Sequence, residues 1–474
     1  MSIDIGPSAI HFAPPSPVRH IAYFDPADDA VPNPGMGICC YGASDHMYVS
    51  AADPHDVRPL DRATFEQMVA LPHCDHIYLR IEWRDIQKEP GKLSLLPVWE
   101  WTLEAAETYG KSWSFRIMPI CPHSRFPRST PEFLDTKLQF VPYHNHQQEY
   151  PGPSVKYFPV YDEVYLRAWQ ELLHLLAERF DQHPLLEFVD ISGYGKWGEW
   201  HHWPETDYEG AHHAPVVRRL VDDHLQAFRS TPAVMLLTPS TQHWKDEVIF
   251  YVLQQGCGLR RDSFYPLFTT WEYQLVSTHR QPGTPFVYES GLHPDQVQTE
   301  TGIESMTYAR IYQRLLDIGA SYVGLGFNPW HALITHDEYP ALLQKITARI
   351  GYRLRPAIVW LKRTTAHERK WLSVGLINDG VAPPSGTLTL RARFDSGPEL
   401  AVTLPPGLPA PGPMELVELE LPPAFDAYGH GNMFTLSLTL TLGGKERPVR
   451  WAVPSSAATA DRYQLRLSVP NAID

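Results

Sequence analysis

Short apolar runs alternate with helical patterns between about residue 35 and residue 350. Several of these runs are continuous rather than alternating, as expected of strands that are buried on both faces. They predict eight strands, at 37–41, 76–81, 113–120, 186–192, 234–238, 258–263, 285–289 and 322–328. Eight alternations of strand and helix favour an α/β fold of the (β/α)8 TIM barrel type over an open doubly wound sheet. No G-x-G-x-x-G pattern follows the first predicted strand, which removes the main support for a dinucleotide fold.

The segments between the predicted strands carry helical patterns. The clearest is 162–180, where Val164, Ala168, Leu172 and Leu176 recur at three- and four-residue spacing. The other predicted helices are 98–109, 215–228, 243–255, 305–318 and 337–350. Two longer connections, 121–161 and 193–215, are rich in Tyr, Trp, His and Pro. In a barrel they would follow the carboxyl ends of strands, where active sites are built.

From about residue 353 the pattern changes to short, often alternating runs rich in Val, Leu and Thr, separated by Pro and Gly turns. This texture is typical of an all-β sandwich. The predicted strands are 358–362, 371–378, 387–394, 399–404, 414–421, 433–442, 449–453 and 463–469. The sequence therefore predicts a catalytic barrel over residues 1–353 and an accessory β-sandwich over residues 354–474.

Composition and charge narrow the function classes. The chain of 474 residues has 40 Lys and Arg against 54 Asp and Glu, a formal charge of −14. This balance argues against nucleic-acid or anionic-membrane partners, for which positive charge supplies most of the affinity. The five cysteines form no C-x-x-C pair, no apolar stretch is long enough to span a bilayer, and the first 17 residues do not resemble a signal peptide. We therefore expect a cytoplasmic protein.

Two glutamates occupy the positions at which barrel enzymes place catalytic groups. Glu199 lies in Gly193-Tyr-Gly-Lys-Trp-Gly-Glu-Trp200, just beyond the fourth predicted strand, and Glu289 ends the seventh. Hydrolysis of a glycosidic bond needs such a pair, one to protonate the leaving oxygen and the other to attack the sugar or to activate water. We expect the tryptophans at 197, 200 and 203 to give Glu199 an apolar surround that raises its pKa. The alternative is that both glutamates are ordinary ion-pair residues.

Around this pair the sequence resembles a known family. Asn33-Pro-Gly-Met-Gly37, Tyr78-Leu-Arg-Ile-Glu-Trp83 with Glu89-Pro-Gly91, and Gly198-Glu-Trp200 resemble the retaining (β/α)8 glycoside hydrolases of clan A. The likeness is closer to a poorly characterised bacterial group of barrel-plus-sandwich proteins with β-galactosidase-like motifs. It implies Glu199 as acid/base and Glu289 as nucleophile. Clan A enzymes usually have Asn directly before the acid/base, whereas this chain has Gly198.

Other residues are candidates for substrate binding, and each has a structural alternative. Arg80 and Arg116 lie within barrel strands, where an Arg either pairs with a carboxylate or orients a sugar hydroxyl. The remaining candidates are aromatic or acidic residues near strand ends, namely Trp200, Asp262, Tyr288 and Trp330. Sugar C–H faces pack on aromatic rings, so Trp330 resembles a platform under the sugar. The alternatives are a structural cap for Asp262 and core packing for Tyr288 and Trp330.

No cofactor or metal is predicted. The 23 histidines include His73-x-x-His76, His144-x-His146, His201-His202 and His212-His213, but none shows H-E-x-x-H spacing. The sequence predicts a retaining glycoside hydrolase that acts on terminal β-linked sugars of the β-galactoside or β-glucoside type, with a small oligosaccharide or glycoside as substrate. An inverting glycosidase and a non-catalytic carbohydrate-binding barrel are the alternatives. We expect no nucleic-acid or membrane partner, and the sequence leaves a homo-oligomer open.

Overall fold

The computed structural model describes residues 18–43, 60–122, 124, 126–142, 156–200, 213–237, 243–261, 270–289, 317–326, 328–363, 369–426 and 432–470. Eight parallel strands close into a barrel in the order β10-β11-β2-β3-β4-β7-β8-β9. They are β2 (Gly37–Ala43), β3 (His76–Glu82), β4 (Ser112–Met118), β7 (Leu186–Asp190), β8 (Ala233–Leu236), β9 (Gly258–Arg261), β10 (Phe286–Glu289) and β11 (Tyr322–Leu325). The predicted (β/α)8 barrel is thereby confirmed, with all eight strands at their predicted places.

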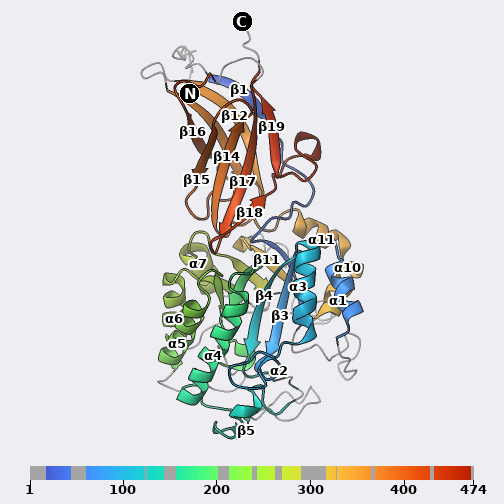
Figure 1. Cartoon of the computed structure of the whole chain (residues 1–474), viewed down its shortest axis with the longest axis vertical. Coiled ribbons are helices and arrows are strands. Elements are labelled where there is room, and N and C mark those ends of the chain that lie inside the picture. The colour runs from blue at the N-terminus through green and yellow to red at the C-terminus, as the bar shows by residue number, and fades with distance from the viewer. Residues whose placement is uncertain are drawn as a thin grey trace, which may run out of the picture.

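Helices surround the barrel (Figure 1). They are α1 (Arg62–Val69), α2 (Trp83–Ile86), α3 (Pro97–Tyr109), α4 (Glu163–Phe180), α5 (His213–Ala227), α6 (His243–Gln254), α7 (Thr270–His279), α10 (Pro329–Glu338) and α11 (Pro340–Thr347). A two-stranded ribbon of β5 (Val141–Pro142) and β6 (Lys156–Tyr157) lies beyond the carboxyl ends of the barrel strands. Asp162 caps α4, because its carboxylate accepts from the amide of Val164.

The helix predictions need two corrections. The predicted helix 337–350 corresponds to α11, which begins at Pro340, and the preceding helix α10 was not predicted; α10 ends before Pro340 because that residue has no amide hydrogen to continue it. In α4 the buried face carries Leu172 and Leu176 as predicted, but Val164 is 41% exposed and Tyr165, Trp169 and Phe180 also belong to the face. The larger part of the predicted helix 305–318 lies outside the described residues.

Side chains alternate between the two faces of each barrel strand, so the buried side chains form two layers, one inside the barrel and one outside it. Inside the barrel, Tyr41, Tyr78, Phe188 and Tyr322 belong to one apolar cluster. Outside it, a much larger cluster joins the strands to the helices and continues into the sandwich. Only the alternate residues that face inward reach the barrel interior beyond this aromatic cluster, toward the carboxyl ends of the strands. The alternation therefore decides which polar side chains can contact one another there.

The C-terminal part is a β-sandwich, as predicted. A four-stranded sheet has the order β1-β12-β13-β16, and a second sheet has β15-β14-β17-β18 with β19 also paired to β17. Their bounds are β1 (Val18–Tyr23), β12 (Leu354–Arg363), β13 (Lys370–Asn378), β14 (Thr387–Phe394), β15 (Glu399–Thr403), β16 (Glu415–Leu421), β17 (Met433–Leu442), β18 (Lys445–Val449) and β19 (Gln464–Ser468).

Two details of the sandwich differ from the sequence prediction. The N-terminal strand β1 pairs with β12, so residues 18–23 belong to this sheet and not to the barrel, although the predicted domain division left them with the barrel. The predicted strand 449–453 is wrong, because the chain forms a hairpin that places β18 at Lys445–Val449. Gly443 and Gly444 form its two-residue turn with φ of 56° and 77°, the conformation that such a turn requires.

The sandwich packs on the amino-terminal end of the barrel, and the strands of the barrel point away from it (Figure 1). The contact is built from the β17–β18 hairpin. Arg447 forms an ion pair with the buried Glu187 of β7, and the ammonium of Lys445 donates to the backbone oxygen of Leu186 at 3.2 Å. The accessory domain therefore closes the barrel end opposite to the one where strand ends place catalytic groups.

Among the described residues, no helix combines the length and the apolar character needed to cross a bilayer. The five cysteines are all buried as free thiols.

Candidate active site

Glu199 is presented by a tight turn that follows β7. After Asp190 the chain passes through Gly193 and Gly195, both at positive φ, into a single 3-10 turn at Lys196–Gly198. The amide of Trp197 donates to the oxygen of Ile120, beyond β4, at 2.8 Å, and this contact fastens the turn to the neighbouring strand. Glu199 then lies beside the inward-facing residues of β4, and its side chain is 4% exposed.

Gly198 is required by this turn. Its φ is +73°, and a Cβ atom built on it would lie 2.8 Å from the Cβ of Ser192. Asn tolerates a positive φ better than most residues, but its Cβ would meet the same obstacle. The absence of the usual clan A Asn at this position therefore follows from the local backbone.

Glu289 ends β10 and faces the barrel interior, where two arginines contact it. The guanidinium of Arg80, on β3, donates from Nη1 to Oε1 of Glu289 at 2.6 Å. The guanidinium of Arg260, on β9, donates from Nη1 to Oε2. Glu289 is 1% exposed, so each of its carboxylate oxygens is neutralised by a buried charge.

Arg260 also contacts Glu199, and this brings the two predicted glutamates together. Its Nη2 lies 3.1 Å from Oε1 of Glu199, while Nε lies 2.7 Å from Oδ2 of Asp190. Burial alone would lower the pKa of Arg260, but the charges of Asp190 and Glu289 raise it well above its ordinary value. One permanently charged guanidinium therefore holds three carboxylates.

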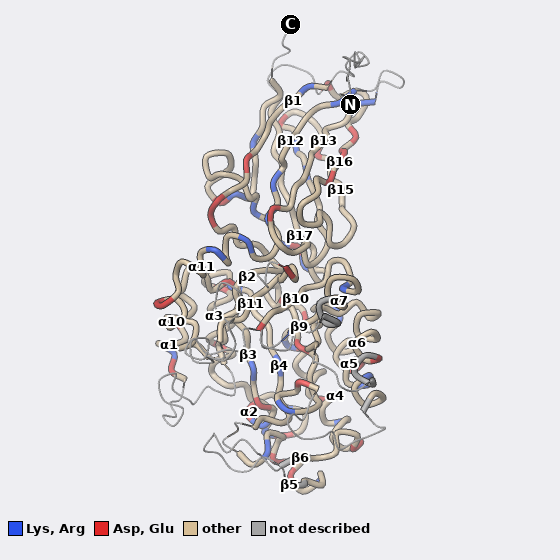
Figure 2. Tube along the Cα trace, turned by 180° about the vertical axis from the view of Figure 1, so that it is seen from behind, with Lys and Arg blue, Asp and Glu red and all other residues tan. Residues whose placement is uncertain are grey.

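Arg116 is the third arginine of the group. The parallel register places it directly beside Arg80, and its Nη1 lies 2.6 Å from Oε1 of Glu199. The site thus contains three buried guanidiniums, of Arg80, Arg116 and Arg260, and three buried carboxylates, of Asp190, Glu199 and Glu289. Figure 2 shows such charged positions along the barrel tubes near the labels β3, β4 and β9.

Three of the residues around the pair were not predicted from the sequence. Arg260 lies in the buried strand Gly258–Arg261, where an unpaired charge is rare, and this was a readable signal. Asp190 ends β7 just as Glu289 ends β10 and accepts from the hydroxyl of Tyr78 at 2.5 Å. Glu82 ends β3 and accepts from the hydroxyl of Ser124 at 2.5 Å.

The expectation that tryptophans surround Glu199 needs correction at Trp200. Trp200 is 1% exposed and stacks on Tyr194 with 6.3 Å between ring centroids, within the cluster outside the barrel. Trp203 lies outside the described residues. The guanidiniums of Arg116 and Arg260 contact the carboxylate of Glu199.

The other predicted residues take different places. Tyr288 precedes Glu289, so it faces the opposite side of β10 and belongs to the outer cluster beside Phe286. Trp330 lies in the first turn of α10, two residues after the cap residue Asn328, and is half-buried. Asp262 follows β9 directly and lies outside the described residues. The structure thus brings Arg80 and Arg116 to the glutamates, and it does not bring Tyr288.

Within the described ranges, no group of three or more His, Cys, Asp or Glu side chains is arranged to hold a metal ion. His76 forms hydrogen bonds with the hydroxyls of Ser112 and Ser114 at 2.8 and 2.6 Å, at the amino-terminal end of the barrel. The histidines at 144, 146, 201, 202 and 212 are outside the described part of the chain.

Comparison with known proteins finds similar solved structures. Endo-glycoceramidase II from Rhodococcus sp. is 14% identical with a TM-score of 0.43, over 85% of this chain and 100% of that one. A psychrophilic family 10 endo-β-1,4-xylanase is 8% identical with a TM-score of 0.35, over 62% and 86%. An endo-1,4-β-xylanase from Caldicellulosiruptor owensensis is 8% identical with a TM-score of 0.36, over 61% and 84%. No protein-family model matches the sequence, and no curated protein matches it.

Proposed function

We propose that this chain is a glycoside hydrolase that acts on terminal β-linked sugars, of the β-galactoside or β-glucoside type, by a retaining mechanism. The observation that carries the proposal is the contact of Glu199 and Glu289 with one guanidinium, that of Arg260, at the carboxyl end of the barrel. Carboxyl groups about 5–5.5 Å apart suit direct attack on the sugar, whereas about 6.5–9.5 Å leaves room for a water molecule. Contact with neighbouring nitrogens of a single guanidinium favours the shorter separation.

In the first step Glu289 would attack the anomeric carbon and form a glycosyl-enzyme, while Glu199 would give its proton to the departing oxygen. Arg80 and Arg260 support the role of Glu289, because each guanidinium contacts one of its carboxylate oxygens and holds the side chain in place. In the second step Glu199 would take a proton from water as the water attacks the glycosyl bond. The sugar then leaves, and Glu199 is protonated again.

The surroundings of Glu199 suit the second step better than the first. Arg116 and Arg260 favour its carboxylate form, which is the form that a general base needs. The negative charge of Glu289 acts in the opposite direction and is removed once the glycosyl-enzyme forms. We therefore assign Glu199 a strong role as base and expect proton donation to be the harder half of its task.

Other residues would act on the sugar or on the pair. Arg80 and Arg116 are almost fully buried against the glutamates, so we assign them positioning roles. Trp330 is half-buried at the start of α10, at the carboxyl end of β11, which supports its assignment as the sugar platform.

The test is to change Glu199 and Glu289 separately to Gln and to measure kcat/KM on a panel of aryl β-glycosides. We expect Glu289→Gln to abolish turnover, and Glu199→Ala to be rescued by azide with a β-glycosyl azide as product. Glu187→Gln is the matched control, because Glu187 is also buried, lies on β7 and pairs with an arginine, but at the other end of the barrel. Near wild-type rates for Glu289→Gln would rule out the mechanism. Product of inverted configuration would establish the inverting alternative.

A second candidate is a carbohydrate-binding barrel without catalysis. The observation that favours it is that Glu199 is buried beside the guanidiniums of Arg116 and Arg260, as in a structural ion-pair network. Binding of simple sugars to the wild-type chain, seen by calorimetry without product release on any glycoside of the panel, would favour this candidate.

A further inference from the structure

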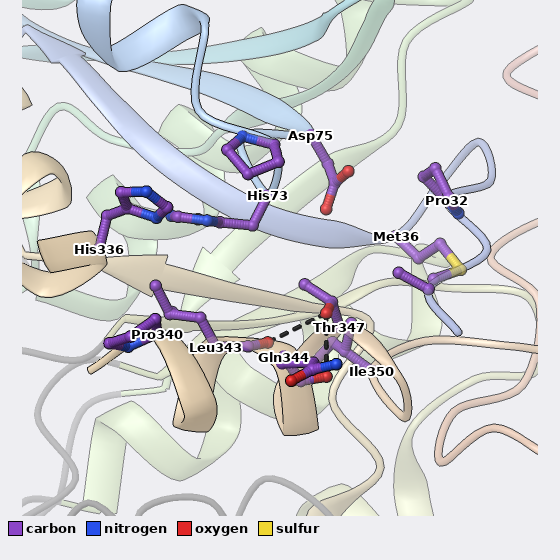
Figure 3. Close-up of a pocket in the computed structure, with 12 residues that line it drawn as sticks. Pro32, Met36, His73, Asp75, His336, Pro340, Leu343, Gln344, Thr347 and Ile350 are labelled. Carbon is purple, nitrogen blue, oxygen red and sulfur yellow. Dashed lines mark hydrogen bonds between the residues drawn. The ribbon is translucent and has the colours of Figure 1, made fainter. Parts of the chain in front are cut away.

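A cavity of about 240 Å³ lies at the amino-terminal end of the barrel, remote from the glutamate pair. Its walls come from the residues just before β2 and β3, from the chain that leads into β2, and from α10 and α11 (Figure 3). Pockets for drug-sized ligands range from about 300 to 1,000 Å³, so this cavity suits a smaller molecule. All of its lining residues belong to the described part of the chain.

One side of the cavity is polar and carries two imidazoles. His73 and His336 lie with ring centroids 5.0 Å apart and planes tilted by 31°. Nε2 of His73 and Nδ1 of His336 are buried and have no hydrogen-bond partner among the described residues. His73 is only 6% exposed. A buried polar nitrogen without a partner costs free energy, and a ligand that bonds to it would recover that cost.

Asp75 adds a carboxylate to the same side. One of its oxygens, Oδ2, accepts from the amide of Ile38 at 3.0 Å. Figure 3 shows its carboxylate directed to the space between His73 and Met36. The nearby ammonium of Lys111 is already engaged, because it donates to the backbone oxygen of Cys74 at 2.5 Å. The cavity therefore contains a negatively charged hydrogen-bond acceptor, and no lysine or arginine lines its wall.

The protonation states of His73 and Asp75 agree with a cavity wall that accepts hydrogen bonds. Burial lowers the pKa of His73 to about 4, so its imidazole is neutral at pH 7 and offers a lone pair. Burial raises the pKa of Asp75 to about 6, so the carboxylate still predominates at pH 7. The opposite wall is apolar, formed by Met36, Leu343 and Ile350.

We propose that this cavity binds a small organic ammonium ion, with its N–H groups directed to Asp75, His73 and His336 and its short alkyl chain against Met36, Leu343 and Ile350. A primary ammonium has three N–H donors and no acceptor, which matches a carboxylate beside the unpartnered nitrogens of His73 and His336. An anion would be repelled by Asp75. A metal ion is not favoured, because no group of three or more His, Cys, Asp or Glu side chains among the described residues is arranged to hold one.

The test uses n-butylammonium chloride as the probe, titrated into the full chain by calorimetry, with 1-butanol and butyrate as comparison ligands. We expect n-butylammonium alone to bind measurably. The side-chain nitrogen resonance of His73 should shift on binding, which locates the site. Asp75→Asn keeps an oxygen for the amide of Ile38 and removes the charge, so we expect its affinity to fall by about tenfold or more.

Glu338→Gln is the matched control, because Glu338 is an exposed carboxylate at the end of the helix that carries His336. Its effect on affinity should stay below about twofold. His73→Phe tests the imidazole separately and should weaken binding while filling the same space. Equal binding of 1-butanol or butyrate to the wild-type chain would overturn the proposal, as would unchanged affinity in either variant or no binding at all. The comparison of the three ligands decides the matter even if a variant does not fold.

Discussion

Glu199 and Glu289 are joined by the guanidinium of Arg260, which contacts one with Nη2 and the other with Nη1. Glu289 ends β10, whereas Glu199 follows the turn after β7, so this contact exists only because the sheet closes. Arg260 also reaches Asp190 through Nε at 2.7 Å. It is thus the residue on which the geometry of the pair depends.

Replacement of Arg260 should disable the site more than it unfolds the chain. Arg260→Lys keeps a charge but cannot contact both carboxylates with one planar group, so we expect kcat/KM to fall by about 10²-fold or more. Arg260→Met leaves buried carboxylates without their partner and should lower the free energy of unfolding by about 3–5 kcal/mol. Steady-state rates and urea denaturation check the two effects. Full activity in Arg260→Lys would contradict the bridging role.

The dependence on the leaving group should expose the role of Glu199. Because Arg116 and Arg260 favour the ionised form of Glu199, protonation of the leaving oxygen is the demanding part of the first step. We expect Glu199→Gln to lose about 10²–10⁴-fold in kcat/KM on alkyl glycosides. Glycosides of dinitrophenol need no proton donor and should lose far less. An equal loss on both substrate classes would argue against proton donation by this residue.

Gly198 offers a test of the local backbone. Gly198→Asn introduces a Cβ that meets Ser192 at 2.8 Å, so we expect it to destabilise the fold by about 1–3 kcal/mol and to lower activity. Gly91→Asn is the matched control, because Gly91 has nearly the same φ, +72°, and no atom within 4 Å of its Cβ position. Thermal melting of both variants separates the clash from the effect of φ. Equal melting temperatures would show that Ser192 yields easily.

The contact between the two domains should matter for stability and not for the chemistry. Arg447→Met leaves Glu187 buried without its arginine and should lower the free energy of unfolding by about 3–5 kcal/mol. The neighbouring Glu446 makes a looser surface pair with Arg391, at 3.7 Å, so Glu446→Gln should change stability by less than about 1 kcal/mol. The activity of folded protein should stay near wild type in both variants, because the hairpin lies at the far end of the barrel. Denaturant titration with parallel rates provides the measurement.

His224 should make the fold sensitive to acid. Burial lowers the pKa of His224 from 6.5 to about 4, and only its hydrogen bond to the oxygen of Leu220 opposes this. Since the unfolded chain binds the proton more readily, stability should fall as the pH drops from about 6.5 to about 4, by at most about 3 kcal/mol. His224→Gln should flatten this part of the pH profile, whereas His279→Gln, at an exposed histidine of α7, should leave it unchanged. An unaltered profile in His224→Gln would contradict the assignment.

Much of the site could be read from the sequence because it depends on strand ends. The apolar runs placed Glu289 at the end of the seventh strand, and the glycines around Trp197 marked a tight turn that presents Glu199. Arg80 and Arg116 were singled out because charged residues inside buried strands need partners. Arg260 carries the same signal and was overlooked. Tyr288 was assigned to the site by proximity, although the period of two along a strand turns it to the other face.

The sequence by itself determined the barrel, the sandwich and the approximate bounds of their strands, because these follow from local periodicity and turn residues. Tertiary structure alone decided that β1 joins the sandwich and that the sandwich covers the amino-terminal end of the barrel. It also decided that two arginines from neighbouring parts of the barrel contact Glu199. These features depend on which strands become neighbours when the barrel closes, and pairing between distant segments leaves no mark on the pattern of any single segment.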